Sequence, residues 1–71
     1  MRYTVIVEEG ERSWGAYVPD LPGCVVAGET KEEVLQLIRE AMEFHLEGLR
    51  KQGEPIPRPH SHSEVVEIDA A

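Results

Sequence analysis

Apolar and polar residues alternate in three short stretches near the start of the chain, and this pattern predicts three strands. The stretches cover residues 2–9, 13–18 and 24–29. A period of two residues gives each strand one apolar face and one more polar face. Residues 10–12 form a turn of hairpin length between the first two stretches, so we expect these two strands to pair antiparallel.

A second turn separates the second and third stretches. It contains two prolines and a glycine, which interrupt ladder pairing and favour turn conformations. We therefore predict that this segment has a structural role as a turn between antiparallel strands. Its residues are Pro19, Asp20, Leu21, Pro22 and Gly23.

One long helix is predicted after the third stretch by a capping box at Thr30 and Glu33. In this motif the Thr30 hydroxyl accepts from the backbone N–H of Glu33, and the Glu33 carboxylate accepts from the N–H of Thr30. Gly28, two residues before Thr30, is expected to have a structural role as a small residue ahead of the cap. We expect the helix to end near Gln52, because Gly53 can adopt the left-handed conformation that closes a helix.

The last part of the chain predicts an extended connection followed by a fourth strand. Three prolines between residues 55 and 59 exclude a helix, and residues 65–68 are mostly apolar. The order strand, strand, strand, helix, strand predicts an α+β fold with two layers. Its four-stranded mixed sheet has the order 3-2-1-4, with the last strand parallel to the first through a right-handed crossover and one helix on one face. We expect residues 1–71 to form a single domain.

The predicted helix has a wider apolar surface than a single sheet requires. Its apolar arc covers roughly 200°, whereas packing on a sheet needs a stripe of about 100°. Leu35 and Leu46 lie on one flank of this arc, and Leu37 and Phe44 lie on the other. Two interpretations stay open, because either the proline-rich connection or a partner protein can cover these flanks.

The sheet face away from the helix is also predicted to carry apolar residues, namely Ile6, Tyr17 and Val25. An antiparallel sheet tolerates one wet face, but three apolar side chains there make a plausible contact surface. The outer edge of the third strand is free to pair with another chain.

Length and cysteine content limit how the protein can be stabilised and where it is found. A domain of this size buries only about 60% of its unfolded surface, so we expect a partner or self-association to add stability. Cys24 is the only cysteine; it has no basic neighbour to activate it, and we predict a small packing residue. The single thiol, with no leader or membrane-length apolar run, predicts a cytoplasmic location.

Charge restricts the class of partner. Fourteen acidic and seven basic residues give a net charge of −7, and the basic residues are scattered. Because nucleic-acid backbones are bound mainly by clustered lysine and arginine, we expect no direct nucleic-acid contact. The acidity suits a basic protein partner, although it also simply favours solubility.

No combination of residues predicts catalysis, a cofactor or a metal centre. His45 lies within the apolar arc of the helix and is expected to be a hydrogen-bonded core residue. His60 and His62 give too few ligands for a closed metal site, so we predict a solvated loop there. The acidic residues fall at strand ends and turns, and an enzyme is not expected. A residual hydrolase dependent on Asp20 or Asp69 is the remaining catalytic alternative.

Several segments resemble the HicB-like antitoxin family. They are WGAYVPDLPGC at residues 14–24, GET with the following acids at 28–33, FHLEGL at 44–49 and GEPIP at 53–57. The similarity extends over nearly the whole chain in the family's order. It implies a partial ribonuclease H-like fold without nuclease activity. It also implies a small, basic, messenger-RNA-cleaving toxin of the HicA type as partner. Many family members carry a C-terminal DNA-binding domain, which we do not expect in this chain.

The resulting hypothesis is a non-catalytic module that neutralises a small basic toxin by direct contact. We predict partner contacts at Trp14, Tyr17, Leu35 and Leu46. The alternative is a self-assembling structural or regulatory module that uses the same surfaces to form a homo-oligomer and has no toxin partner.

Overall fold

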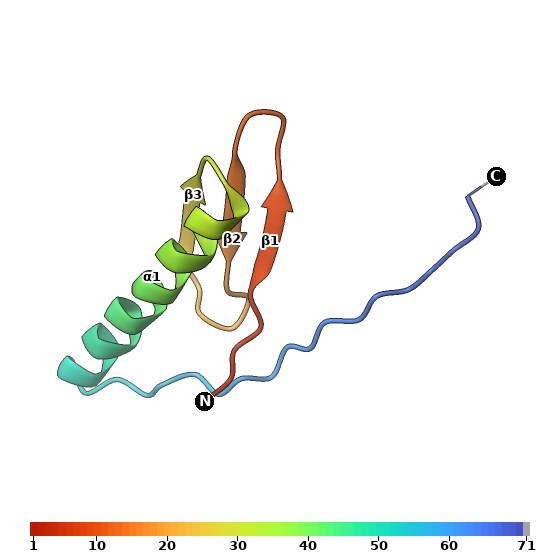
Figure 1. The fold of residues 1–71 in the computed structure, drawn as a ribbon. Coiled ribbons are helices and arrows are strands. Elements are labelled where there is room, and N and C mark those ends of the chain that lie inside the picture. Colours follow the sequence, from red (N-terminus) through yellow and green to blue (C-terminus); the bar gives the residue numbers. More distant parts are fainter. Residues whose placement is uncertain (71) are drawn as a thin grey trace.

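The protein folds as a three-stranded antiparallel sheet with one helix across one face (Figure 1). The computed structural model describes residues 1–70. The strands are β1 (Ile6–Glu9), β2 (Trp14–Tyr17) and β3 (Val25–Gly28), followed by helix α1 (Lys31–Lys51). The sheet order β1-β2-β3 confirms the α+β class, the antiparallel pairing of the first three strands and the single covering helix.

The strands are shorter than predicted, most clearly at the start of β1. This strand begins at Ile6, which pairs with Tyr17 of β2. Continuing the same register by two residues brings Thr4 opposite Pro19, which has no backbone N–H to donate. The ladder therefore ends where the second strand enters its proline-containing turn, and residues 2–5 extend beyond it.

The core lies between the sheet and α1, and it includes the turn between β2 and β3. Leu21 in this turn is completely buried. Two backbone hydrogen bonds hold the turn around it. The Leu21 N–H donates to the Val18 carbonyl at 3.1 Å, and the Cys24 N–H donates to the Leu21 carbonyl at 3.0 Å. Gly23 has a φ of 85°, which favours glycine. The buried apolar residues are Ala16, Val18, Leu21, Cys24, Val34 and Ile38.

Cys24 is a packing residue, as predicted. It is a free, buried cysteine, and burial raises the pKa of its thiol because the apolar surroundings disfavour the thiolate. A neutral thiol is a poor nucleophile, so this residue contributes volume to the core rather than reactivity.

The start of α1 has the predicted cap with one difference. The Thr30 hydroxyl accepts from the N–H of Glu33 at 3.0 Å. However, Oε1 of Glu33 accepts from the N–H of Glu29 at 2.9 Å, so the predicted bond to the N–H of Thr30 is wrong by one residue. Gly28 explains this shift, because a β-carbon there would collide with the Glu33 carboxylate. Glycine lets the carboxylate reach past β3 to the earlier amide.

The end of α1 agrees with the prediction. Gln52 is the C-cap, and Gly53 takes a left-handed conformation with a φ of 69°. The N–H of Gly53 donates to the Arg50 carbonyl and that of Glu54 to the Leu49 carbonyl. These bonds satisfy carbonyls that the helix leaves without partners.

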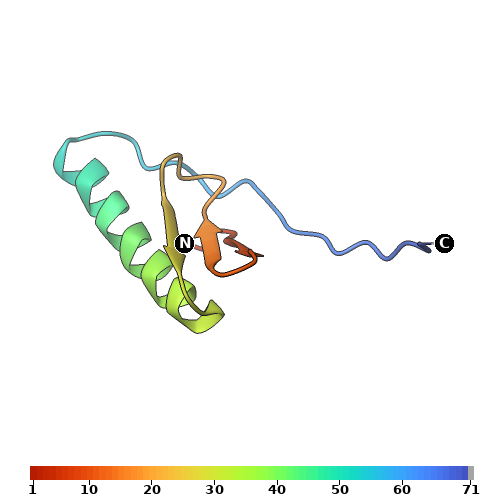
Figure 2. The ribbon, with the colours of Figure 1, turned by 90° about the horizontal axis from the view of Figure 1, so that it is seen from above.

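The predicted fourth strand is wrong for the described part of the chain. After α1, residues 54–61 pass beside the N-terminal residues, and residues 62–70 then extend away from the sheet (Figures 1 and 2). Within residues 1–70 only β2 pairs with β1, so the order 3-2-1 is present without a fourth strand. Val65, Val66 and Ile68 are 98%, 77% and 78% exposed. The physical reason is an anchor at residues 60–61, described below.

Replacing the buried leucine of the second turn is expected to destabilise the fold strongly. Leu21→Ala removes a fully buried side chain, so we expect urea unfolding to show a loss of about 2–5 kcal/mol. Val65→Ala is the control, because Val65 is 98% exposed and its truncation should change stability by less than about 0.5 kcal/mol. A loss below about 1 kcal/mol for Leu21→Ala would show that the turn is not part of the core.

The helix cap gives a second, smaller expectation. Thr30→Ala removes the acceptor for the Glu33 N–H and should lower stability by about 0.5–2 kcal/mol in the same measurement. Thr30→Ser keeps the hydroxyl and should retain most of that stability. Equal losses in the two variants would contradict the assigned cap.

Candidate protein-binding surfaces

A buried carboxylate holds the C-terminal segment against the turn between β2 and β3. Asp20 is only 4% exposed. Its Oδ2 accepts from the backbone N–H groups of His60 and Ser61 at 2.8 and 2.9 Å, and its Oδ1 accepts from the Ser61 hydroxyl at 2.6 Å. Nε2 of His60 lies 3.1 Å from Oδ1. We call this arrangement of Asp20, His60 and Ser61 the Asp20 clamp.

These contacts favour the ionised form of Asp20. The hydrogen bond from the Ser61 hydroxyl makes the largest contribution and, with the two backbone N–H groups and His60, lowers the pKa from 3.8 to about 2. Burial opposes the shift, because removing a carboxylate from water favours its neutral form. The hydrogen bonds outweigh burial, so the clamp holds a charged carboxylate.

The clamp contains Ser, His and Asp, but its geometry does not form a nucleophilic relay. In a relay the serine donates to the histidine and the histidine donates to the aspartate. Here the Ser61 hydroxyl donates directly to Asp20. Both carboxylate oxygens already accept hydrogen bonds. Across residues 1–70, no three potential ligands among His, Cys, Asp and Glu come together to hold a metal ion.

Two other contacts fix the same segment beside the start of the chain. The Tyr3 hydroxyl donates to the Pro57 carbonyl, and Oγ1 of Thr4 donates to the Ser61 carbonyl at 2.8 Å. His60 and His62 are exposed, as predicted for a solvated loop. The prediction did not include the anchoring of this loop to the second turn and to the N-terminal residues. His45, expected in the core, is only half-buried and lies outside the core cluster.

The sheet face away from α1 carries an apolar row. The strand register aligns Ile6 with Tyr17 and Tyr17 with Val25, so the three residues lie side by side across the sheet. Tyr17 is 39% exposed and Val25 is 65% exposed. Helix α1 lies on the other face (Figure 2). We call Ile6, Tyr17 and Val25 the open-face row.

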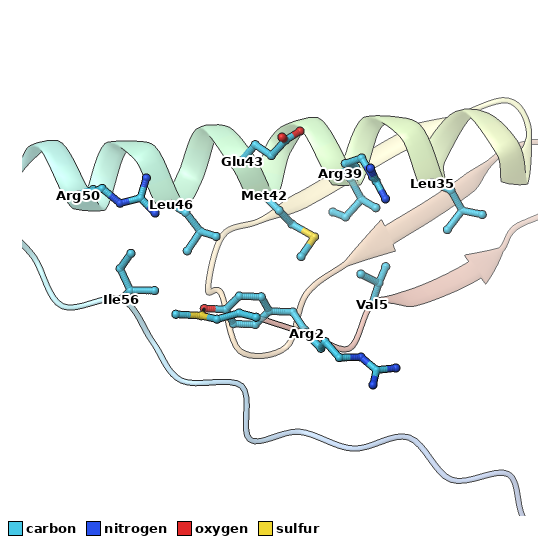
Figure 3. Close-up of a pocket in the computed structure, with 12 residues that line it drawn as sticks. Arg2, Val5, Leu35, Arg39, Met42, Glu43, Leu46, Arg50 and Ile56 are labelled. Atoms are coloured by element: carbon cyan, nitrogen blue, oxygen red, sulfur yellow. Dashed lines mark hydrogen bonds between the residues drawn. The ribbon is translucent and has the colours of Figure 1, made fainter.

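On the helix side, an apolar groove of about 590 Å³ separates α1 from the N-terminal residues (Figure 3). Apolar side chains of α1 such as Met42 and Leu46 point into it from one wall, and the other wall is formed by Met1, Arg2, Tyr3, Val5 and Ile56. We call it the helix groove. Its apolar lining includes Val5, Leu35, Ile38, Met42, Leu46 and Ile56.

The helix groove differs in charge from the rest of the molecule. Arg2, Arg39 and Arg50 line it, together with one acid, Glu43. Three of the seven basic residues in the chain therefore gather around one apolar groove, although the net charge of the protein is −7.

The structure separates the four predicted contact residues into three environments. Tyr17 lies in the open-face row, whereas Leu35 and Leu46 line the helix groove. Trp14 is half-buried and packs against the core. The sequence identified these two exposed surfaces on opposite sides of the sheet, but it did not show that Trp14 packs against the core.

The Asp20 clamp predicts a pH-dependent loss of stability. The folded state holds the pKa of Asp20 at about 2, below its ordinary value of 3.8. Its stabilisation is therefore present above about pH 4 and is lost as the pH falls towards 2, where the unfolded chain takes up the proton first. Asp20→Asn should have a lower Tm at pH 7, and its difference from the wild type should shrink to nothing near pH 2.

The matched control for this variant is Asp69→Asn, in the exposed tail, which should leave the Tm unchanged at both pH values. Circular dichroism follows the Tm, and amide exchange at Ser61 reports the anchor directly. A difference between wild type and Asp20→Asn that does not depend on pH would contradict the charged clamp.

Comparisons with known proteins match both the sequence and the fold. The family model described as HicB_like antitoxin of bacterial toxin-antitoxin system matches residues 3–70. A UPF0150 protein of Thermoplasma acidophilum is 42% identical over 67 residues, covering 93% of this chain and 97% of that protein. Antitoxin HicB 2 of Photorhabdus laumondii is 34% identical over 76 residues, covering 100% of this chain but only 52% of its own length.

A solved structure agrees with these relatives. A chain of the HicA3 and HicB3 toxin-antitoxin complex superimposes with a TM-score of 0.69 at 30% identity, covering 83% of this chain and 70% of that chain. Over residues 1–70, no helix combines the length and apolar character needed to cross a membrane. The family match over residues 3–70 and the shared fold place this chain in the HicB-like antitoxin family.

Proposed function

We propose that this protein is a non-catalytic binding module that neutralises a small, basic, messenger-RNA-cleaving toxin of the HicA type. The proposal is supported by membership of the HicB-like family and by similarity to a chain of a HicA3–HicB3 complex. Neutralisation by contact requires only a complementary surface, and the cytoplasm is where such a toxin meets messenger RNA.

The observation that carries the proposal is the open-face row. An antiparallel sheet can leave one face to solvent, but here that face presents an aromatic and two aliphatic side chains in line. Tyrosine is enriched among residues that dominate binding energy, because its ring buries a large area and its hydroxyl can still hydrogen-bond. We therefore place Tyr17 at the centre of the toxin contact.

Charge near this row suits a basic partner. Glu8 pairs with Gly15, two positions along the ladder from Ile6 and Tyr17, so it lies on the same face by alternation. The net charge of −7 attracts a basic protein over a longer range and steers its approach. Acidic groups beside an apolar row provide the polar rim that surrounds most interface cores.

The helix groove suits a basic toxin less well. Arg39 and Arg50 there would face the toxin's own basic groups, and like charges across an interface cost binding energy. Of the predicted contact residues, we thus assign Tyr17 to the toxin interface. Leu35 and Leu46, which line the helix groove, would contact a different partner. Trp14 packs against the core on the side of β2 that carries Ala16, so it is not assigned to the toxin contact.

Substituting the open face should abolish neutralisation without unfolding the protein. Tyr17→Asp places a charge in the centre of the row, and we expect the dissociation constant for the toxin to rise at least about 30-fold, the scale of an interface hot spot. Val25→Asp, at a 65% exposed site, should have a similar effect. Phe44→Asp is the matched control, because Phe44 is exposed on α1, away from this face.

The partner is recovered with the wild-type chain as bait in its own cell extract and identified by mass spectrometry. Support requires a small basic protein in equal proportion, whose RNA cleavage is blocked by wild type and Phe44→Asp but not by Tyr17→Asp. Undiminished inhibition by a folded Tyr17→Asp variant would contradict the assigned surface. Recovery of only the bait's own copies would contradict the toxin partner and favour the second candidate.

That second candidate is a homo-oligomeric regulatory module without a toxin. The exposed apolar tail at residues 65–68 favours it, because such a segment is stabilised by contact with another surface. Self-association and toxin binding are compatible if they use different surfaces.

A further inference from the structure

The C-terminal tail, residues 62–70, is an extended arm with unprotected apolar side chains. Val65, Val66 and Ile68 are between 77% and 98% exposed. The radius of gyration is 14.2 Å, compared with about 11 Å for a compact domain of this length. The arm accounts for this excess, since it projects from the sheet in both views (Figures 1 and 2).

The domain also has an open strand edge with an apolar groove above it. Among residues 1–70, β1 pairs with β2 on one side only. Helix α1 packs mainly over β3 and β2, leaving the helix-facing side of β1 less covered. The helix groove continues from this position beneath α1. Its lining begins at the residues just before β1, with Val5 on the floor and Leu35, Met42 and Leu46 above it (Figure 3). At the other edge of the sheet, α1 packs directly over β3.

The arm and the groove are complementary in pattern. In a strand, Val66 and Ile68 point to the same face, and Val65, Glu67 and Asp69 point to the other. A strand added beside β1 would direct alternate side chains towards α1, so Val66 and Ile68 would enter the apolar part of the groove.

The arm and the groove are also complementary in charge. Residues 62–70 contain three acids, Glu64, Glu67 and Asp69, and no lysine or arginine. The groove carries three arginines and one glutamate. By alternation Glu64 shares the groove-facing side with Val66 and Ile68, whereas Glu67 and Asp69 face the other way. One carboxylate of the added strand would thus lie beside the arginines, a better match in charge than a basic toxin offers.

The Asp20 clamp directs each arm away from its own groove. Ser61 is fixed by Asp20 and Thr4 at the end of the sheet where β1 begins. Beyond it the arm departs on the side away from α1 (Figure 2), whereas the groove lies on the helix side. Nine extended residues span about 30 Å, enough to cross the 26 Å intermediate axis of the molecule and reach a second copy.

We infer that two copies of this chain exchange their C-terminal arms. Residues 64–69 of each copy add a strand to the free edge of β1 in the other, and Val66 and Ile68 fill the other copy's helix groove. Such strand addition uses backbone hydrogen bonds for affinity and alternate side chains for specificity. A reciprocal exchange is two-fold symmetric and closes as a dimer. The inference does not depend on the toxin proposal, because Tyr17 and Val25, on β2 and β3, take no part in it.

Sedimentation of the full chain at micromolar concentration tests the exchange. The wild type should be a dimer. The double variant Val66→Asp, Ile68→Asp puts two charges into the groove and should raise the dimer dissociation constant on the order of a hundredfold or more. Val65→Asp is the matched control, since it changes the same kind of side chain on the opposite face of the arm and should remain dimeric. All three positions are exposed in a single chain, so the variants should keep the fold, which circular dichroism checks.

A mixing experiment identifies the surfaces that meet. Leu35→Glu blocks the groove but leaves the arm intact, while the double arm variant has an intact groove. Each alone should be monomeric, and an equimolar mixture should form a heterodimer held by one intact arm in one intact groove. Tyr17→Asp should dimerise like the wild type, which keeps this test separate from toxin binding.

Three outcomes would overturn the exchange. A wild-type monomer with amide protection over residues 64–69 would show that the arm pairs with its own β1. A wild-type monomer without such protection would show that the arm is simply free. A dimer insensitive to the double arm variant would place the interface elsewhere.

Discussion

The structure depends on the burial of one carboxylate. Asp20 lies in a turn whose neighbour Leu21 is part of the core, so the carboxylate is withdrawn from water together with it. A buried charge is tolerated only when several donors surround it. Those donors come from His60 and Ser61. The turn therefore needs the C-terminal segment to stabilise its buried charge, and the segment is held in place by the turn. The direction in which residues 62–70 leave the domain follows from this requirement.

Local features of the fold were predictable because each depends on residues close together in the sequence. The alternation along the strands, the proline-containing turn, the Thr30 cap and the Gly53 helix end all have local physical causes. The shifted bond of Glu33 is a partial exception. It depends on the close approach of Gly28 to the first helical turn, which is a tertiary distance that spacing does not contain.

The anchoring of the C-terminal segment could not be predicted in the same way. Asp20 and His60 are 40 residues apart, and nothing in the pattern near either residue indicates the other. The apolar residues at 65–68 suggested a fourth strand, but no strand is present there, because periodicity within a segment does not reveal whether a sheet edge lies within its reach. Likewise, the helix periodicity identified Leu35 and Leu46 as an exposed flank. Only the fold brings Arg2 and Arg39 beside them and makes the groove basic.

The order of neighbours in this fold has a consequence for how quickly it forms. Each strand pairs with the strand next to it in the chain, and α1 follows β3 after two residues. Most of the contacts thus close short loops, which is the arrangement associated with rapid folding. The contact between Asp20 and residues 60–61 instead closes a loop of about 40 residues at a higher entropic cost. The sheet and helix can therefore form before residues 60–61 reach the turn. In that order of events the domain passes through a stage in which Asp20 still lacks the groups that hold its charge.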